Sequence, residues 1–237
     1  MIYNKAFYKN AGGLSRPLTK QELLNEIKIR LDRGQTNLND IDTSKITDMS
    51  SLFYEISQNV DVSLWDTSNV TNMKAMFSGC YALTTVPLID TSSVTNMYDI
   101  FYSCSSLTTI PALNTINVKN MNYMLGGCTS LASIPEFDAS SVTDMSSYFG
   151  FSTMNNLRDV GGWKNLKCNW NDSNGLSKCP NLTHQSCINI LNGLYDFTGN
   201  GETPNYNQGK LKVHANFLTT VGEDISIGIN KGWTITS

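Results

Sequence analysis

The stretch from Asp66 to Pro87 decides the fold: it reads Asp-Thr-Ser-Asn-Val-Thr-Asn-Met-Lys-Ala-Met-Phe-Ser-Gly-Cys-Tyr-Ala-Leu-Thr-Thr-Val-Pro, and its pattern recurs every 24 residues. The first half recurs in five copies, with columns at Asp42, Asp66, Asp90, Asn114 and Asp138; Ile46, Val70, Val94, Val118 and Val142; Met49, Met73, Met97, Met121 and Met145; and Phe53, Phe77, Phe101, Leu125 and Phe149. The second half recurs in three copies, with columns at Cys80, Cys104 and Cys128; Leu83, Leu107 and Leu131; Val86, Ile110 and Ile134; and Pro87, Pro111 and Pro135. Columns that keep their register over this length indicate a repeat architecture.

A unit of 24 residues cannot bury an apolar face by itself, so such units stack and share one continuous core. Within a unit, Val70, Met73, Met76 and Phe77 have the spacing of one inward face of a short helix or 3-10 turn. Thr71 is placed to cap that turn. We therefore expect an α/β solenoid of 24-residue coils with short helices or 3-10 turns.

The second half of the unit predicts a short parallel strand. Leu83 and Val86 point inward and Pro87 ends the strand, because proline has no N–H to donate to a ladder. Strands of successive coils then stack about 4.8 Å apart. The outward candidates form an uncharged strip suited to hydrogen bonding with sugars or an extended backbone. These candidate binding residues are Thr84, Thr85, Thr108, Thr109 and Ser133. Threonine also favours strands for structural reasons alone.

The N-terminal part predicts a helix that covers the open end of the solenoid. Thr19 and Glu22 form a capping box, and Gly34 is a natural stop. Leu23, Leu24, Ile27 and Leu31 make one apolar face. A terminal coil needs such a cover, because an exposed ladder edge pairs with other chains. The alternative is a docking helix for a larger assembly. Residues 1–16 are either an anchoring arm or an ordered strand.

Three regions follow from this pattern: an N-terminal arm and capping helix over 1–35, the solenoid over 36–160, and atypical last repeats with a C-terminal cap over 161–237. After Phe149 the register slips, and Phe151 with Leu157 restores the Phe-to-Leu spacing. We expect a helix within 176–195 and short strands near 210–213 and 231–235. A separate C-terminal binding domain is the alternative.

The composition excludes several classes of protein. Charged residues make up 16% of the chain, and the net charge is −3. A protein that binds nucleic acid needs an excess of basic residues, so a nucleic-acid partner is not expected. No apolar run approaches the length of a membrane span, and Met1–Asn10 has no secretory pattern. Only two histidines occur, and serine-hydrolase, zinc-protease and nucleotide-binding motifs are missing. The composition alone does not exclude an enzyme that carries repeats. The breaks in the repeat, at Asn114, Lys119 and 150–165, assemble no recognisable acid, base or nucleophile. We therefore expect no enzyme, no cofactor and no membrane insertion.

Two columns of reactive side chains have structural explanations. Cys80, Cys104 and Cys128 are expected to be buried thiols, since three neighbours cannot all pair. The aspartate column is expected to accept hydrogen bonds within its own Asp-Thr-Ser turns. The alternative for this column is a row of calcium ions, although each coil offers few acidic ligands. We expect no metal site.

The repeat resembles a known family. Phe-x-x-Cys-x-x-Leu followed by Leu-x-x-Val/Ile-Pro resembles the leucine-rich repeats of BspA-like surface proteins. The Asp-Thr-Ser-x-Val-Thr-x-Met-x-x-Met-Phe half is similar to mycoplasma lipoprotein-type repeats, which gut bacteria and their bacteriophages also carry. The resemblance covers residues 36–160. It implies a right-handed solenoid used for adhesion and protein binding, with no catalytic residues.

These observations predict a non-enzymatic structural or binding protein. We expect a bacteriophage virion component, such as a fibre, tail or capsid-decorating protein, because no export signal is visible in the sequence. Its partners would be a protein or glycan surface, together with other virion proteins. The alternative is a BspA-like adhesin that is displayed on the bacterial surface or secreted.

Overall fold

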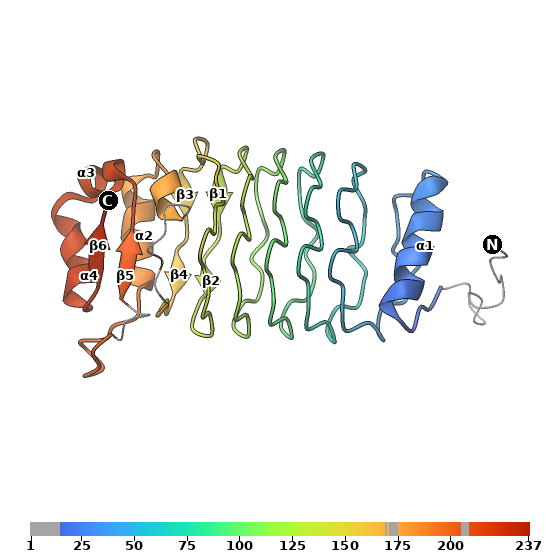
Figure 1. The fold of residues 1–237 in the computed structure, drawn as a ribbon, viewed down its shortest axis with the longest axis horizontal. Coiled ribbons are helices and arrows are strands. Elements are labelled where there is room, and N and C mark those ends of the chain that lie inside the picture. Colours follow the sequence, from blue (N-terminus) through green and yellow to red (C-terminus); the bar gives the residue numbers. More distant parts are fainter. Residues whose placement is uncertain (1–14, 169, 171–174, 205–208) are drawn as a thin grey trace.

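The computed structural model describes residues 15–168, 170, 175–204 and 209–237. The proposed N-terminal arm lies mostly outside these residues. Helix α1, Lys20–Asp32, stands at one end, the 24-residue repeat units lie in a row beside it, and helices α2 to α4 gather at the other end (Figure 1). The polypeptide therefore runs from one end of the row to the other without doubling back.

Helix α1 begins as the sequence predicts. The Thr19 hydroxyl accepts a hydrogen bond from the Glu22 amide, and the Glu22 carboxylate accepts one from the Thr19 amide, so the capping box is confirmed. Leu23, Ile27 and Leu31 are buried in the same apolar core as the repeat units. The helix therefore covers apolar surface of the first unit, as a capping element does.

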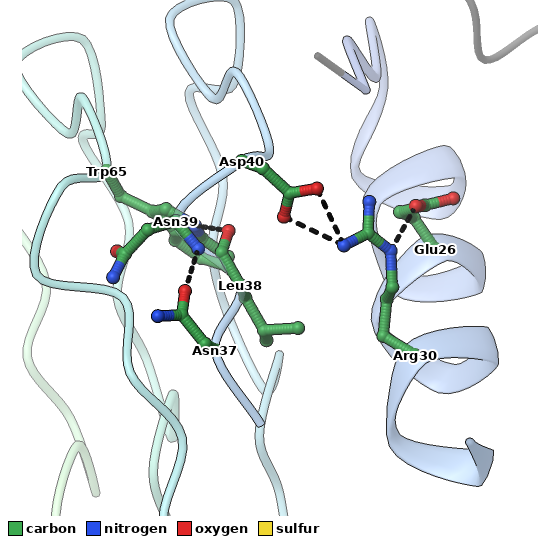
Figure 2. A network of polar contacts seen from close by, with 7 residues as sticks. All are labelled: Glu26, Arg30, Asn37, Leu38, Asn39, Asp40 and Trp65. Carbon is green, nitrogen blue, oxygen red and sulfur yellow. Dashed lines mark hydrogen bonds and ion pairs between the residues drawn. The ribbon is translucent and has the colours of Figure 1, made fainter. Parts of the chain in front are cut away.

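An ion-pair network fastens α1 to the first unit (Figure 2). Nε of Arg30 lies 2.8 Å from Oε1 of Glu26 on the same helix, and Nη1 lies 2.7 Å from Oδ1 of Asp40. The guanidinium group of Arg30 lowers the pKa of Asp40 below its usual value. Behind this network, Nε1 of Trp65 donates to the carbonyl oxygen of Leu38 over 2.9 Å. Helix α1 and the first unit are thus joined by polar as well as apolar contacts.

Neighbouring units are bonded in parallel register. Isolated parallel bridges join Asp48 to Asn72, and then Asn72 to Asn96, Asn96 to Asn120 and Asn120 to Asp144. The Met and Phe columns are fully buried, and stacked rings join successive units. The centroids of Phe53 and Phe77 are 5.3 Å apart, and those of Phe77 and Phe101 are 5.9 Å apart. The columns predicted to be core are confirmed as core.

The turn half of the unit forms neither an α-helix nor a 3-10 helix, so the expected short helix or 3-10 turn over 70–77 is wrong. Ala75 has a φ of 53°, in the left-handed region that no right-handed helix contains. The Met76 amide bonds to the Met73 carbonyl, but the amides of Ala75 and Phe77 donate to the next unit. Hydrogen bonds within one turn therefore alternate with hydrogen bonds to the next unit. This backbone buries Met73, Met76 and Phe77, as a helix would.

The residue that stabilises the start of each turn is the one after the predicted cap. Thr71 lies in a ladder instead, because its amide donates to the Thr47 carbonyl over 2.9 Å. The side-chain oxygen of Asn72 accepts from the Lys74 amide over 3.1 Å. Asp48, Asn96, Asn120 and Asp144 accept in the same way at their own positions.

The extended half forms regular strands only in its third copy. Strand β1, Ser133–Ile134, pairs in parallel with β3, Asp159–Val160. Strand β2, Phe137–Asp138, pairs in parallel with β4, Trp163–Lys164. In the earlier copies the chain is extended but linked by single bonds, such as the one from the Thr108 amide to the Thr84 carbonyl. The predicted strands are therefore shorter and fewer than the repeat pattern suggests.

The C-terminal part contains more helix than expected. The predicted helix is confirmed as α2, His184–Gly193, preceded by η2, Leu176–Lys178. The predicted strands are found as β5, Lys210–Lys212, and β6, Thr234–Thr236, which pair in parallel. Between them lie α3, Ala215–Val221, η3, Gly222–Ile225, and α4, Ser226–Asn230, which the sequence reasoning missed. Within the described residues, no helix is long and apolar enough to cross a membrane.

The register slip after Phe149 resolves differently from the prediction. Phe149 is the buried member of the Phe column, whereas the side chain of Phe151 is 70% exposed. Gly150, between them, has a φ of 64° and its amide bonds to the Ser147 carbonyl. The turn at Gly150 therefore directs Phe151 away from the core, and Phe151 does not continue the column.

Candidate binding surface

The strip predicted on the extended half lies on the surface. Thr84, Thr85, Thr108 and Thr109 are exposed and Ser133 is partly exposed, between buried residues of the Leu and Val/Ile columns. Both threonines of each pair point outward, where the pattern required only one. We call this set, with Ser133, the hydroxyl strip.

The two columns of the hydroxyl strip differ in their bonding. The hydroxyl of Thr108 and its amide both donate to the Thr84 carbonyl, each over 3.4 Å. Among the described residues, no such bond is found for the hydroxyls of Thr85 and Thr109. The strip ends at β3, where Asp159 lies opposite Ser133. The column of Thr85, Thr109 and Ser133 therefore offers the more available hydroxyls.

The aspartate column stabilises the repeat itself. Oδ1 of Asp66 accepts from the Ser68 amide over 3.1 Å, and Asp42, Asp90 and Asp138 do the same in their own turns. The predicted turn is thus confirmed. Hydrogen bonding by Ser92 lowers the pKa of Asp90, which is therefore a carboxylate at neutral pH. Among the described residues, no group of three His, Cys, Asp or Glu side chains gathers as a metal site would require.

All six cysteines are buried free thiols, as predicted for the repeat column. Burial raises the pKa of Cys80, Cys104 and Cys128. A buried thiol with a raised pKa is a poor nucleophile, because the reactive species is the thiolate. The cysteine column therefore contributes packing rather than chemistry.

A group of surface aromatic side chains was missed by the sequence reasoning. The ring centroid of Tyr123 lies 6.2 Å from that of Tyr98, 6.0 Å from that of Tyr102 and 6.0 Å from that of Phe151. We call these four residues the aromatic patch. They come from neighbouring repeat units and from the turn that follows Phe149. Aromatic rings in mutual contact at a surface are common at binding sites, since each supplies a large rigid contact area.

Charged groups border the aromatic patch. Nζ of Lys74 lies 4.8 Å from the ring centroid of Tyr98. Asp99, next in the chain, is partly exposed, and burial raises its pKa although Lys74 acts in the opposite direction. The patch therefore combines apolar rings with one acidic and one basic side chain.

The signal for the aromatic patch was present in the sequence as departures from the repeat. Tyr98 occupies a column that elsewhere holds Ser50, Lys74 and Asn122. Tyr123 occupies a column with Ala75 and Asp99. Within a single unit these columns show no distinctive pattern. Only the stacking of units shows that the aromatic members of different columns meet.

Comparison with known families places the repeat. Residues 24–131 and 107–174 match the family described as Mycoplasma protein of unknown function, DUF285. Together these matches cover more than half of the chain. The chain belongs to this family. No curated protein and no solved structure matches it.

The DUF285 match extends from within α1 through the repeat units to residue 174. The mycoplasma-type resemblance of the repeat is therefore shown. Helices α2 to α4 lie beyond the matched residues. Since the family is described as one of unknown function, the match assigns no role to the hydroxyl strip or to the aromatic patch.

Proposed function

We propose that this DUF285 protein is a non-enzymatic binding protein built as a right-handed leucine-rich-repeat solenoid of the BspA-like type. One observation carries the proposal: polar groups of the buried columns bond between units inside the array, whereas the hydroxyl strip lies on its surface. For example, the Thr67 hydroxyl donates to the Asp90 carbonyl over 2.7 Å, and Thr91 repeats this bond to Asn114 over 2.9 Å. The buried hydroxyls thus support the fold, and the exposed hydroxyls of Thr85 and Thr109 are available for a partner.

The contact surface in this proposal is the hydroxyl strip. Its exposed hydroxyls both donate and accept hydrogen bonds. Leu88, which is also exposed, follows Thr85 by three residues in the sequence and adds apolar contact area. A strip with hydroxyl and apolar groups but no net charge suits a protein or glycan surface, and does not suit phosphate.

The proposed location is a bacteriophage virion, where the protein would act as a fibre, tail or capsid-decorating component. The similarity of the repeat to phage-borne repeats supports this location. The alternative, a bacterial surface adhesin, is supported by the match to a mycoplasma family. Mass spectrometry of purified phage particles and of cell envelopes from the source culture separates the two. Recovery with particles is expected, and recovery only in envelopes would replace the first location by the second.

An arginine-substituted variant tests the contact surface. Thr85→Arg, Thr109→Arg and Ser133→Arg together are expected to keep the native melting temperature and to abolish attachment to host cells. The matched control carries the same added charge on exposed residues elsewhere: Ser57→Arg, Gln58→Arg and Thr129→Arg. Attachment of labelled protein to cells is measured by flow cytometry. Equal attachment by the strip variant and the control would refute the hydroxyl strip as the contact surface.

A further inference from the structure

The aromatic patch is not part of the apolar core. Within the described residues, Tyr98, Tyr102, Tyr123 and Phe151 are outside the cluster of buried apolar side chains that runs through the repeat units. Phe151 is mostly exposed, and the three tyrosines are partly exposed. The rings contact one another across units, with interplanar angles of 72° for Tyr98 and 82° for Tyr102 against Tyr123. The patch is therefore a surface cluster of rings that contact one another.

The fold does not require aromatic residues at these positions. The column of Tyr123 is filled by Ala75 two units earlier, with nearly the same left-handed backbone: φ is 55° at Tyr123 and 53° at Ala75. The column of Tyr102 is filled by Ser78 in one direction and by Gly126 in the other. Large rings that stability does not demand, gathered on a surface, mark an interaction site.

Glycines make room for the rings. A Cβ atom at Gly126 would lie 2.8 Å from Cδ2 of Tyr102, closer than side-chain atoms approach each other. A Cβ atom at Gly150 would lie 3.0 Å from Cα of Gly126 and 3.7 Å from Cδ1 of Tyr123. The ring of Tyr102 thus lies against the backbone of Gly126, and the ring of Tyr123 lies near the backbone of Gly150. Contacts with this backbone and with one another restrict the rings, and such preorganisation lowers the entropic cost of binding.

The polar groups around the patch suit an uncharged, hydroxyl-rich ligand. Asp99 supplies a hydrogen-bond acceptor and Lys74 a donor, and the tyrosine hydroxyls supply both. One carboxylate and one ammonium group leave the patch without net charge. Asp99 disfavours a phosphate or a nucleic acid, since like charges repel. Rings that meet at steep angles present faces and edges, and lack the parallel aromatic walls that hold a polyproline helix.

We propose that the aromatic patch binds a neutral oligosaccharide, with a pyranose ring lying against Tyr123 and Phe151. The C–H groups on one face of a pyranose are attracted to the negative face of an aromatic ring. The hydroxyls at the edge of the sugar would bond to Asp99, Lys74 and the tyrosine hydroxyls. This site is separate from the hydroxyl strip, because the two halves of a unit bury their apolar residues toward a common core and direct these groups away from it.

The test uses the full chain, fluorescently labelled, on an array of neutral gluco-, galacto-, manno- and N-acetylhexosamine oligosaccharides. Sulfated versions and a proline-rich decapeptide are printed beside them. Binding to neutral glycans is expected. Tyr123→Ala and Phe151→Ala are each expected to weaken it by about tenfold or more, as loss of an aromatic anchor does. Tyr81→Ala removes an exposed tyrosine outside the patch and is the matched control.

Three results would overturn this proposal: no glycan binding by the native protein, preference for the decapeptide or the sulfated glycans, or equal binding by Tyr123→Ala and the control. Ala75 shows that the repeat accepts alanine with this backbone, so Tyr123→Ala is expected to fold, and circular dichroism verifies this. The arginine variant of the hydroxyl strip is printed in parallel and is expected to bind the array normally. Failure of one site is thereby distinguished from failure of the other.

Discussion

The thiol of Cys104 donates a hydrogen bond to the carbonyl oxygen of Phe77 over 3.1 Å, across a separation of 27 residues. Cys80 bonds to Phe53 and Cys128 to Phe101 in the same way, each over 3.0 Å. Each thiol therefore adds a second hydrogen bond, from within the apolar core, to a backbone carbonyl of the preceding unit. A small side chain with a weak donor fits this place, and cysteine is such a residue.

The cysteines of the repeat are expected to be unreactive in the folded protein. Burial raises the pKa of Cys80 to about 11 and that of Cys128 to about 12, so the thiol form persists at pH 8. Reaction with Ellman's reagent is expected to be negligible in buffer and to reach all six cysteines in denaturant. Rapid labelling of Cys80 in the native protein, located by peptide mapping, would contradict the packing described for this column.

The ring of Phe77 is expected to contribute strongly to stability. Phe77→Ala leaves a cavity between the stacked rings of Phe53 and Phe101 and should lower the free energy of unfolding by about 3–5 kcal/mol. Phe77→Leu is the matched control, because Leu125 fills the same column and is fully buried. That change should cost about 1.5 kcal/mol or less. Urea denaturation followed by fluorescence gives both values, and equal losses would show that this column does not depend on ring packing.

The buried threonine column is expected to link units through its hydroxyls. Thr91→Val keeps the shape of the side chain but leaves the Asn114 carbonyl without the hydroxyl that now donates over 2.9 Å. Loss of a hydrogen bond of this kind costs about 0.5–1.5 kcal/mol. Thr91→Ser keeps the hydroxyl and is expected to recover most of this loss. If valine and serine variants unfold at the same urea concentration, the hydroxyl makes no net contribution.

The ion pairs of Arg30 are expected to hold α1 on the first unit. Arg30→Met leaves the carboxylate of Glu26 buried without its partner, at a cost of about 2–4 kcal/mol near neutral pH. The double variant Glu26→Gln, Arg30→Met removes both charges and should regain part of that loss. Hydrogen exchange over residues 20–32, read by mass spectrometry, would show faster exchange in the single variant. Unchanged exchange over these residues would show that the ion pairs do not hold the helix on the first unit.

This contribution should depend on pH in a defined direction. Arg30 lowers the pKa of Asp40 in the folded protein below its ordinary value of 3.8. A group with a depressed folded pKa stabilises the fold above its unfolded pKa, and the stabilisation is lost as pH falls through the folded pKa. The difference between native protein and Arg30→Met is therefore expected to be largest near pH 7 and to shrink below pH 4.

The sequence was sufficient to predict what each repeat buries, and insufficient to predict how the backbone does it. Met73, Met76 and Phe77 are buried as their spacing indicates, but the turn half has no helix. The left-handed backbone at Ala75 and Tyr123 has no signature in the sequence, since neither residue is glycine. Hydrogen bonds between units impose that backbone, and the periodicity of one sequence does not reveal these bonds.

The surface was also predictable only in part. The exposure of Thr85 and Thr109 follows from local alternation with buried Leu and Val/Ile columns, so it was predictable. The aromatic patch was not, because Tyr98 and Tyr123 meet although 25 positions separate them in the sequence, in different columns. Phe151 joins them only because the chain turns at Gly150, where the repeat register changes.

The bond from Thr67 to Asp90 is repeated one unit later by the bond from Thr91 to Asn114. Successive pairs of units are therefore joined by the same groups. A duplication or excision of one 24-residue segment would therefore join surfaces that already match. Genes that encode such arrays can change in length by unequal recombination without new folding information. The aromatic patch spans neighbouring units with different residues in the same columns, so every such event would also create or destroy a combination of surface side chains. Under the proposed binding function, a change in the number of units would therefore also change the surface that contacts a partner.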